Sequence, residues 1–407
     1  MTRWIILILI YIIVDLYAFQ VFRSLIKTNW IYIGGGILSF AVLVNFIYQF
    51  TTHDNTIATD IKRAYSAGFF LAVLIPKLLV IIFLFGEDLV RLFMGLYSKI
   101  YSTEQSFYIP SRRKFVGILA LSTAAIPFAS LLYGMARGKY NYKVLKYDMA
   151  FDDLPDAFDG YQITHISDIH CGSFDDKEKV NYGIDLINEQ KSNAILFTGD
   201  LVNNLAEEID PWKNSFSKLT AKDGVYSVLG NHDYGDYVNW QNSNDHKKNN
   251  QRIKDIQAEM GWKLLCNETH FVEKNGERLA FMGVENWGEG FKKEGDLDKA
   301  MTGVADNDFK ILMSHDPSHW KSKVRDDKRN FHLTLSGHTH GMQFGIEIPG
   351  WIKWSPVKYR YEHWAGIYEH AGRYINVNRG FGFIGYPGRV GIWPEISVIT
   401  LRKKNVS

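Results

Sequence analysis

The sequence predicts an α/β layered domain that is preceded by four transmembrane helices. Its first 136 residues contain four long apolar runs, and a helix needs about 20 mostly apolar residues to cross the hydrocarbon layer. From about Lys139 onward, short apolar strands alternate with segments of helical spacing, which is typical of layered α/β domains. We therefore divide the chain into a membrane domain, residues 1–138, and a second domain, residues 139–407.

The apolar runs are the candidate transmembrane helices of a multi-pass membrane protein. They are Trp4–Phe19, Trp30–Phe50, Ala67–Phe85 and Phe115–Tyr133. Asp15 lies in the first run and Lys77 in the third. Charged side chains inside a span are costly and usually have a partner. We expect a structural ion pair between the two, or side chains that extend to the interface, rather than a functional role.

Basic residues in the short loops predict the orientation of these helices. Lys and Arg are more frequent in the loops after the first run and before the fourth than in the middle loop or at the N-terminus. Basic loops stay in the cytoplasm, so the second domain is expected outside the cytoplasm. The stretch 111–117, SRRKFVG, is either a twin-arginine export signal or a set of ordinary basic anchors.

The overall composition argues against several classes of protein. The net charge of +2 gives no indication of a nucleic-acid partner, and none is expected. Only two cysteines are present, Cys171 and Cys266, which excludes a disulfide framework and a cysteine-based zinc site. The lipid bilayer is the expected partner of the four apolar runs.

The second domain has a sequence of expected elements. The strands are Tyr161–Ser167, Ala194–Thr198, Val225–Leu229, Phe309–Ser314, Phe331–Ser336, Tyr374–Asn378 and Ile396–Leu401. Two helices are expected at Lys177–Glu189 and Leu205–Leu219, and Phe271–Val284 reads as a hairpin with Asn275 and Gly276 at its turn. The polar stretch Ser243–Asn250 is expected to be a loop, and a candidate lid.

Polar residues that suit metal ions follow five of these strands. The stretches are SDIH (167–170), TGDLVN (198–203), LGNHDYG (229–235), MSHD (313–316) and SGHTH (336–340). Ligands bind at the carboxyl ends of strands in α/β sheets. One histidine at a strand end is more often a core residue, but five clusters at five strand ends are hard to explain in that way. Carboxylate, amide and imidazole donors without thiolate suit Mn, Fe or Zn.

Together these blocks resemble the calcineurin-like metallophosphoesterase family over residues 145–401. The series is Asp-x-His, Gly-Asp-x-x-Asn, Gly-Asn-His-Asp, His and Gly-His-x-His. The resemblance implies a four-layer α/β sandwich and a metal-dependent phosphoric ester hydrolase with two divalent ions, which would act on a phosphorylated small-molecule or lipid substrate. One ion would be held by Asp168, His170, Asp200 and His340, and the other by Asp200, Asn231, His315 and His338. Asp200 would bridge the two, so His338 and His340 would serve different ions.

The closing stretch 378–396, NRGFGFIGYPGRVGIWPEI, resembles the membrane-associated bacterial branch of this family. That branch includes exported phosphodiesterases and hydrolases that act on the pyrophosphate of UDP-diacylglucosamine, a substrate of lipid A biosynthesis. The resemblance implies a bacterial cell membrane, with the second domain on its outer, periplasmic side. The protein Ser/Thr phosphatases are less similar, because their third block has Glu where this chain has Asp233. Arg379 and Arg389 in this stretch would either bind a substrate phosphate or form surface salt bridges.

The predicted mechanism is attack on phosphorus by a hydroxide that two metal ions share. Manganese is one candidate for the identity of these ions. The departing oxygen then needs a proton. We expect His232 to act as general acid or electrostatic stabiliser, with Asp233 orienting its ring. The alternatives are that His232 only supports a ligand and that Asp233 caps a loop.

Three hypotheses for function remain open at this point. The first is a membrane-anchored two-metal phosphoesterase that hydrolyses a phosphodiester or pyrophosphate of an envelope lipid or lipid-linked nucleotide. The second is a phosphomonoesterase or nucleotide phosphodiesterase whose helices are a simple anchor. The third is a catalytically silent membrane scaffold. The aromatic residues Trp351, Trp354, Tyr359 and Tyr361 would form a membrane-facing lip, a substrate wall or part of the core.

Overall fold

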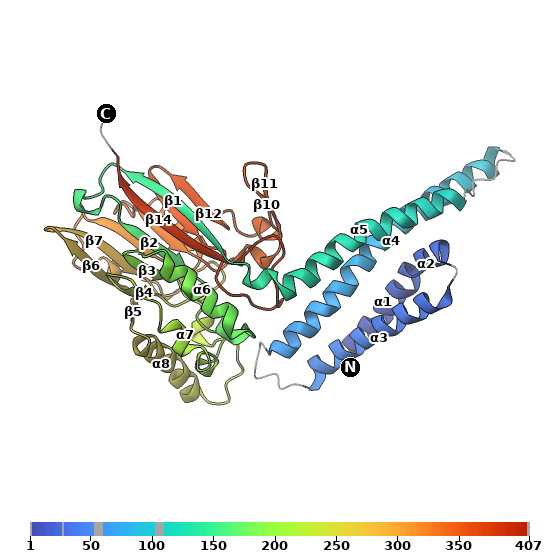
Figure 1. The fold of residues 1–407 in the computed structure, drawn as a ribbon, viewed down its shortest axis with the longest axis horizontal. Coiled ribbons are helices and arrows are strands. Elements are labelled where there is room, and N and C mark those ends of the chain that lie inside the picture. The colour runs from blue at the N-terminus through green and yellow to red at the C-terminus, as the bar shows by residue number, and fades with distance from the viewer. Residues whose placement is uncertain (1, 27, 53–59, 102–109, 405–407) are drawn as a thin grey trace. The chain divides into compact units, whose positions relative to one another are not determined.

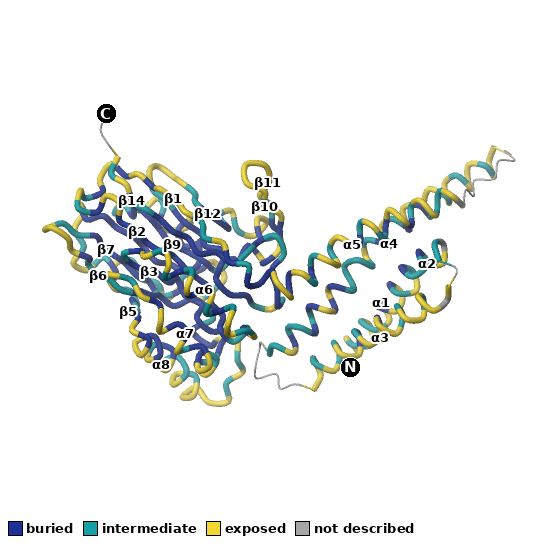
Figure 2. The backbone as a smooth tube through the Cα atoms, viewed as in Figure 1, coloured by how far each residue is buried: buried dark blue, intermediate teal, exposed yellow. Residues whose placement is uncertain are grey.

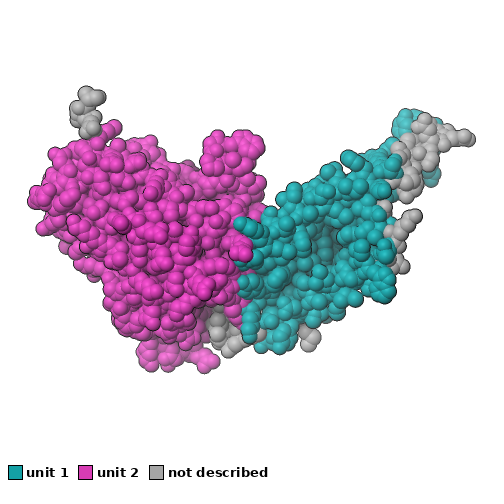
Figure 3. All heavy atoms as spheres, in the orientation of Figure 1, with its two compact units in different colours: residues 1–53, 62–136 teal, residues 54–61, 137–407 magenta. Residues whose placement is uncertain are grey.

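The computed structural model describes residues 2–26, 28–52, 60–101 and 110–404. It divides the chain into two compact units, coloured separately in Figure 3. We call residues 1–53 and 62–136 the helical unit, and residues 54–61 and 137–407 the sheet unit.

The helical unit is built from long apolar helices (Figure 1). Its helices are α1 (Thr2–Ala18), α2 (Gln20–Leu25), α3 (Asn29–Thr52), α4 (Ile61–Tyr101) and α5 (Pro110–Ala136). Among the described residues, four segments are long and apolar enough to cross a membrane, and most of their residues are not buried within the protein. Outward-facing apolar side chains are what a helix in lipid presents. These properties indicate a membrane protein with four candidate spans.

Helix α4 continues well beyond the expected run, which ended at Phe85. Its extension carries charged residues that pair with α5: Arg113 lies 2.8 Å from Asp88 Oδ1 and 3.1 Å from Glu87 Oε2. Arg113 belongs to the stretch SRRKFVG, so in this structure one of its two arginines is an ion-pairing residue between helices.

The charges inside the expected spans form one cluster in the helical unit. Lys77 Nζ lies 2.5 Å from Asp15 Oδ1 and 3.1 Å from the Tyr11 hydroxyl. Ser39 donates to Asp15 Oδ2 at 2.5 Å and also contacts Lys77. The predicted ion pair is therefore confirmed, and hydroxyl groups from α1 and α3 complete its hydrogen bonding.

Exchanging these two charges tests the pair. Asp15→Lys or Lys77→Asp alone is expected to destabilise the protein by roughly 3 kcal/mol, because each leaves two like charges side by side within a membrane span. The double exchange should recover most of this loss, since the pair is restored in the opposite sense. The melting temperature and yield of the full-length protein in detergent would report the effect. A double variant no better than the worse single variant would contradict the pairing.

The sheet unit contains two six-stranded sheets. The first has the order β1 (Lys143–Phe151), β14 (Glu395–Lys403), β2 (Gln162–Ile166), β3 (Ala194–Phe197), β4 (Val225–Ser227) and β5 (Trp262–Leu264). The second has the order β12 (Gly366–His370), β13 (Arg373–Val377), β9 (Leu333–Ser336), β8 (Phe309–Met313), β7 (Glu277–Gly283) and β6 (Glu268–Lys274). Strands β2 to β5 are parallel, as are β13, β9, β8 and β7.

The two sheets pack face to face, with helices outside them, and the buried backbone lies between these layers (Figure 2). Successive side chains of a strand point to opposite faces of the sheet. In β3, Ala194 and Leu196 pack toward the second sheet, whereas Ile195 and Phe197 pack toward the helices, so both faces of the first sheet are covered. The first sheet is covered by α6 (Lys177–Glu189), α7 (Lys213–Phe216) and α8 (Ser243–Glu259), and the second by α9 (Leu297–Ala300) with Trp320 and Val324. The predicted α/β sandwich of four layers is confirmed.

Two expected elements differ. The expected helix Leu205–Leu219 is broken into a 3-10 turn, Ala206–Ile209, and α7, because Pro211 has no N–H to donate to the carbonyl four residues before it. The stretch expected as a polar loop, Ser243–Asn250, is the start of α8. Its Asn242 side chain caps the helix, and the apolar residues that pack it come only later in the chain.

The hairpin was predicted correctly. Strands β6 and β7 pair antiparallel, and Asn275 and Gly276 join them with φ angles of 54° and 81°. Both residue types accept this left-handed backbone, which the tight turn requires.

Candidate metal centre

The five polar stretches converge at one edge of the sheet unit. Asp168 and His170 follow β2, Asp200 follows β3 and Asn231 follows β4 in the first sheet; His315 follows β8, and His338 and His340 follow β9 in the second sheet. Because both sheets end their parallel strands here, residues far apart in sequence become neighbours. All seven except the slightly accessible His338 are buried.

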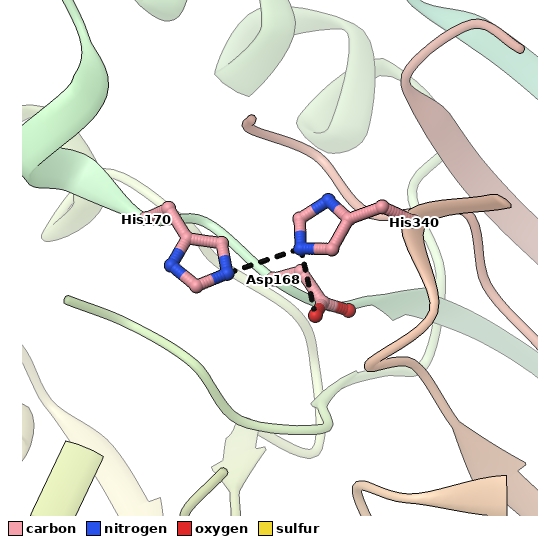
Figure 4. Close-up of side chains that lie close together, drawn as sticks. All are labelled: Asp168, His170 and His340. Carbon is pink, nitrogen blue, oxygen red and sulfur yellow. Dashed lines mark hydrogen bonds and ion pairs between the residues drawn. The ribbon is translucent and has the colours of Figure 1, made fainter. Parts of the chain in front are cut away.

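One group consists of Asp168, His170 and His340 (Figure 4). His340 Nε2 lies 3.0 Å from His170 Nε2 and 3.2 Å from Asp168 Oδ1. His170 Nδ1 is 3.2 Å from the carbonyl oxygen of Val202, to which it can only donate. The lone pair of His170 Nε2 therefore faces the group.

A second group consists of Asp200, His315 and His338, and Asn231 joins it. His315 Nε2 lies 3.1 Å from both Asp200 Oδ2 and Asn231 Oδ1, and His338 Nδ1 lies 2.8 Å from Asn231 Oδ1. Asp200 Oδ2 is also 3.5 Å from His170 Nε2. The Asp200 carboxylate thus faces both groups, and the two rings of His338 and His340 belong to different groups.

The two groups suit metal cations. His315 Nδ1 can only donate to the Thr198 carbonyl at 2.8 Å, so in the neutral ring Nε2 presents a lone pair to oxygens that also accept. Lone pairs of nitrogen and oxygen atoms that point at one another repel, so this arrangement is stable only when a positive charge lies among them. Burial lowers the pKa of His315, but the Asp200 carboxylate raises it to about 10, which reflects the same demand. Nitrogen and oxygen donors without thiolate fit Mn, Fe or Zn.

Backbone strain marks five of the seven candidate ligands. Their φ angles are positive at Asp168 (52°), His170 (47°), Asp200 (60°), His338 (68°) and His340 (49°). Such left-handed backbone at non-glycine residues costs of order 1–3 kcal/mol each and tends to occur at functional sites. The surrounding contacts must therefore hold these loops in place.

Gly337 shows how tightly the loops approach. A Cβ atom at this position would lie 1.8 Å from Ser167 Oγ and 2.2 Å from Asp168 Oδ2. The backbone N–H of the next residue, His338, donates to the Asp168 carboxylate at 2.9 Å. Glycine is therefore required for the fifth stretch to reach the first.

His232 lies beside both groups without belonging to either. Its backbone N–H donates to Asp200 Oδ1 at 2.8 Å, and its Nδ1 lies 2.7 Å from the carbonyl oxygen of Asn203. The ring packs against that of His170, with 5.0 Å between centroids. Because Nδ1 donates to a carbonyl, Nε2 is the nitrogen left to exchange a proton with a substrate.

The expectation that Asp233 orients the His232 ring is not met. Its carboxylate instead accepts backbone N–H groups of Asp200 (2.9 Å), Leu201 (2.8 Å) and Gly230 (2.9 Å). Burial and the nearby Asp200 charge raise the pKa of Asp233 to about 7. The turn at His232 points consecutive side chains in different directions, so Asp233 ties the second and third stretches together from behind the site.

A substrate contact by Arg379 or Arg389 does not fit the structure. Arg379 forms buried ion pairs with Glu395 and, at 2.5 Å, with Glu347 Oε1. Arg389 is fully buried and donates to the carbonyl oxygen of Gly382 from Nε at 2.9 Å. Both arginines hold the closing stretch in shape rather than facing a substrate.

The sequence did not predict that three further residues contact the candidate ligands. The Tyr361 hydroxyl lies 2.8 Å from His338 Nε2, and the Tyr237 hydroxyl accepts from Asn231 Nδ2 at 2.8 Å. Asp316 Oδ2 is 3.5 Å from His338 Nε2. Asp316 follows His315 directly, which is a local signal, whereas Tyr361 reaches His338 only through the fold.

Comparison with known families agrees with this architecture. Residues 2–139 match a family described as "Probable Calcineurin-like phosphoesterase, transmembrane domain". Residues 161–342 match the family "Calcineurin-like phosphoesterase", and this range contains all five polar stretches.

Similar proteins occur in bacteria and animals. The chain is 28% identical to the Bacillus subtilis metallophosphoesterase YkuE over 305 residues, 72% of this chain and 99% of that one. It is 27% identical to a metallophosphoesterase of Helicobacter pylori strain J99, covering 77% and 78% of the two chains. A Danio rerio transmembrane protein with a metallophosphoesterase domain is 25% identical, covering 80% and 71%. The chain therefore contains a calcineurin-like phosphoesterase domain, preceded by a transmembrane domain of the kind found in probable calcineurin-like phosphoesterases.

Proposed function

We propose that this protein hydrolyses a phosphodiester or pyrophosphate bond in a membrane amphiphile, at a centre that holds two divalent metal ions. The observation that carries the proposal is the meeting of the two ligand groups at Asp200, with Asp200 Oδ2 3.1 Å from His315 Nε2 and 3.5 Å from His170 Nε2. The ligands would be Asp168, His170, Asp200 and His340 for one ion, and Asp200, Asn231, His315 and His338 for the other.

Two bound divalent ions would supply an activated water and offset the charge on the phosphoryl oxygens. The protein's own residues supply the rest. His232 holds its Nδ1 proton on the Asn203 carbonyl, so Nε2 faces outward to protonate the departing oxygen. Tyr361 and Asp316 hold the outer nitrogen of the His338 ring, which fixes its orientation.

The membrane helices favour a lipid substrate over a soluble one. An envelope lipid or a lipid-linked nucleotide keeps its phosphate near the bilayer, where a membrane-anchored enzyme would meet it. We place the catalytic domain on the outer side of a bacterial membrane because of the basic loops. A UDP-linked lipid would favour the opposite side, so a reporter fused to the C-terminus decides between these substrates.

Metal removal followed by a substrate panel tests the proposal. The full-length protein in nanodiscs would be stripped with a chelator and reloaded with Mn, Fe or Zn. We expect activity to disappear on stripping and to return with two ions per chain, because each ligand group binds one. Bis(p-nitrophenyl) phosphate and UDP-diacylglucosamine should be better substrates than p-nitrophenyl phosphate.

Each alternative predicts a different result in this panel. Preference for the monoester, or equal turnover of soluble nucleotides and lipids, would support a general phosphatase with a helical anchor. Two bound ions without hydrolysis of any substrate would support a silent scaffold.

A further inference from the structure

The exposed apolar side chains of the sheet unit are concentrated in one short segment. Among its described residues, nine large apolar side chains are exposed, and seven of them lie between Met342 and Tyr359. These seven are Met342, Phe344, Ile346, Ile348, Trp351, Ile352 and Tyr359. Trp351 is 82% exposed and Tyr359 78%. Isolated exposed apolar residues are ordinary, but a contiguous group marks an interaction surface.

This segment, residues 342–360, has a defined shape. Strands β10 (Ile346–Ile348) and β11 (Ile352–Trp354) pair antiparallel and form a hairpin of their own, drawn largely as exposed in Figure 2. The Gly345 N–H donates to the Val390 carbonyl at 2.9 Å, and Arg379 binds Glu347. The apolar side chains are thus held outward on a hairpin that is anchored at its base.

The free charge of the segment is positive. Lys358 and Arg360 are exposed, and no carboxylate is recorded within ion-pair distance of either among the described residues. Glu347, which pairs with Arg379, is the one carboxylate in residues 342–360, against Lys353, Lys358 and Arg360. Tryptophan and tyrosine together with lysine and arginine are the residues enriched where a protein meets the lipid–water interface.

The segment also adjoins the metal centre in sequence and in space. It begins two residues after His340 and ends next to Tyr361, whose hydroxyl lies 2.8 Å from His338 Nε2. Arg360 lies over the ring of Phe291, 5.7 Å from its centroid, and Phe291 packs against His338.

We infer that residues 342–360 dock into the lipid–water interface of the bilayer that holds the helices. A bilayer fits better than a protein partner because the same chain carries four candidate membrane spans, and only residues 137–142 separate α5 from β1. Positive charge beside apolar side chains matches an anionic lipid surface. On the proposed function, this docking brings the phosphoryl group of a lipid to the metal centre through Tyr361 and Arg360.

Fluorescence quenching in proteoliposomes tests this docking without any turnover. In a Cys266→Ser background, which leaves only the buried Cys171, an environment-sensitive fluorophore would be attached to Ile348→Cys. The control is Tyr182→Cys, on an exposed position of α6. In vesicles of phosphatidylglycerol and phosphatidylcholine, we expect spin-labelled lipid to remove most of the fluorescence at 348 and iodide to remove most of it at 182.

Charge reversal provides the second arm. Lys358→Glu combined with Arg360→Glu should reduce the lipid quenching at 348, and only in vesicles that contain the anionic lipid. Equal quenching of both labels by iodide would overturn the inference. Protection of the 348 label from both quenchers would also overturn it, because a protein contact would then cover the hairpin. Since the readout needs no hydrolysis, failure of the proposed function leaves it unchanged.

Discussion

Asp200→Asn is expected to abolish hydrolysis and to release metal from both halves of the centre. Asp200 Oδ2 faces His170 Nε2 at 3.5 Å and His315 Nε2 at 3.1 Å, so one charge serves both ligand groups. Asparagine has the same shape and can still accept the His232 N–H through Oδ1, but it lacks the charge. We expect kcat/KM to fall by about 10³-fold or more, roughly 4 kcal/mol of transition-state stabilisation.

Metal content and melting temperature make this prediction specific. Metal analysis of the purified variant should show fewer than two ions per chain, while the melting temperature of the metal-free protein should stay near that of the metal-free wild type. Asp236→Asn is the matched control: Asp236 is an exposed carboxylate that pairs with Lys292 at 3.4 Å. An Asp200→Asn protein that keeps both ions and full activity would contradict the bridging role.

His232→Ala is expected to reduce kcat by about 10²- to 10⁴-fold while leaving the metal content unchanged, as is typical of losing a general acid. The ring belongs to neither ligand group, and its Nδ1 is engaged by the Asn203 carbonyl. The loss should be larger for a lipid alkoxide leaving group than for p-nitrophenolate, because p-nitrophenolate departs readily without a proton.

The comparison of leaving groups separates the two roles considered for His232. Equal losses on both substrates would assign it electrostatic stabilisation rather than proton transfer, and unchanged kcat would remove it from the mechanism. His246→Ala is the control. His246 lies on α8, its Nε2 is 2.6 Å from the carbonyl oxygen of Tyr234, and it is not part of either ligand group.

Local chemistry made the elements and the candidate ligands predictable. Helix α6 was expected with its observed bounds because Val180, Ile184 and Ile187 recur at helical spacing and are buried. The ligand types could be recognised because carboxylate, amide and imidazole residues follow one strand after another. Helix α8 was missed because its first eight residues are polar and its stability comes from Ile253 and Ile256 packing on the first sheet.

Several contacts between distant segments of the sheet unit could not be predicted in this way. Asp233 seemed a natural partner for its neighbour His232, but the turn directs its carboxylate to the backbone of Asp200 and Leu201. Arg379 and Arg389 suited a phosphate by residue type, yet burial against Glu395 and the Gly382 carbonyl assigns them to the fold. The residue type determines which interactions a side chain can make, and the residues around it in the fold determine which of them it does make.

The histidines of the fifth stretch show where this division lies. The sequence by itself determined that His338 and His340 are candidate ligands, and alternation in a strand would place both on one side. Only the tertiary structure decided that His338 uses Nδ1 toward Asn231 and His340 uses Nε2 toward Asp168. Both residues lie beyond β9 with φ of 68° and 49°, so strand alternation no longer applies. Loops from two sheets hold that strained backbone in place, and no local pattern in the sequence encodes such a contact.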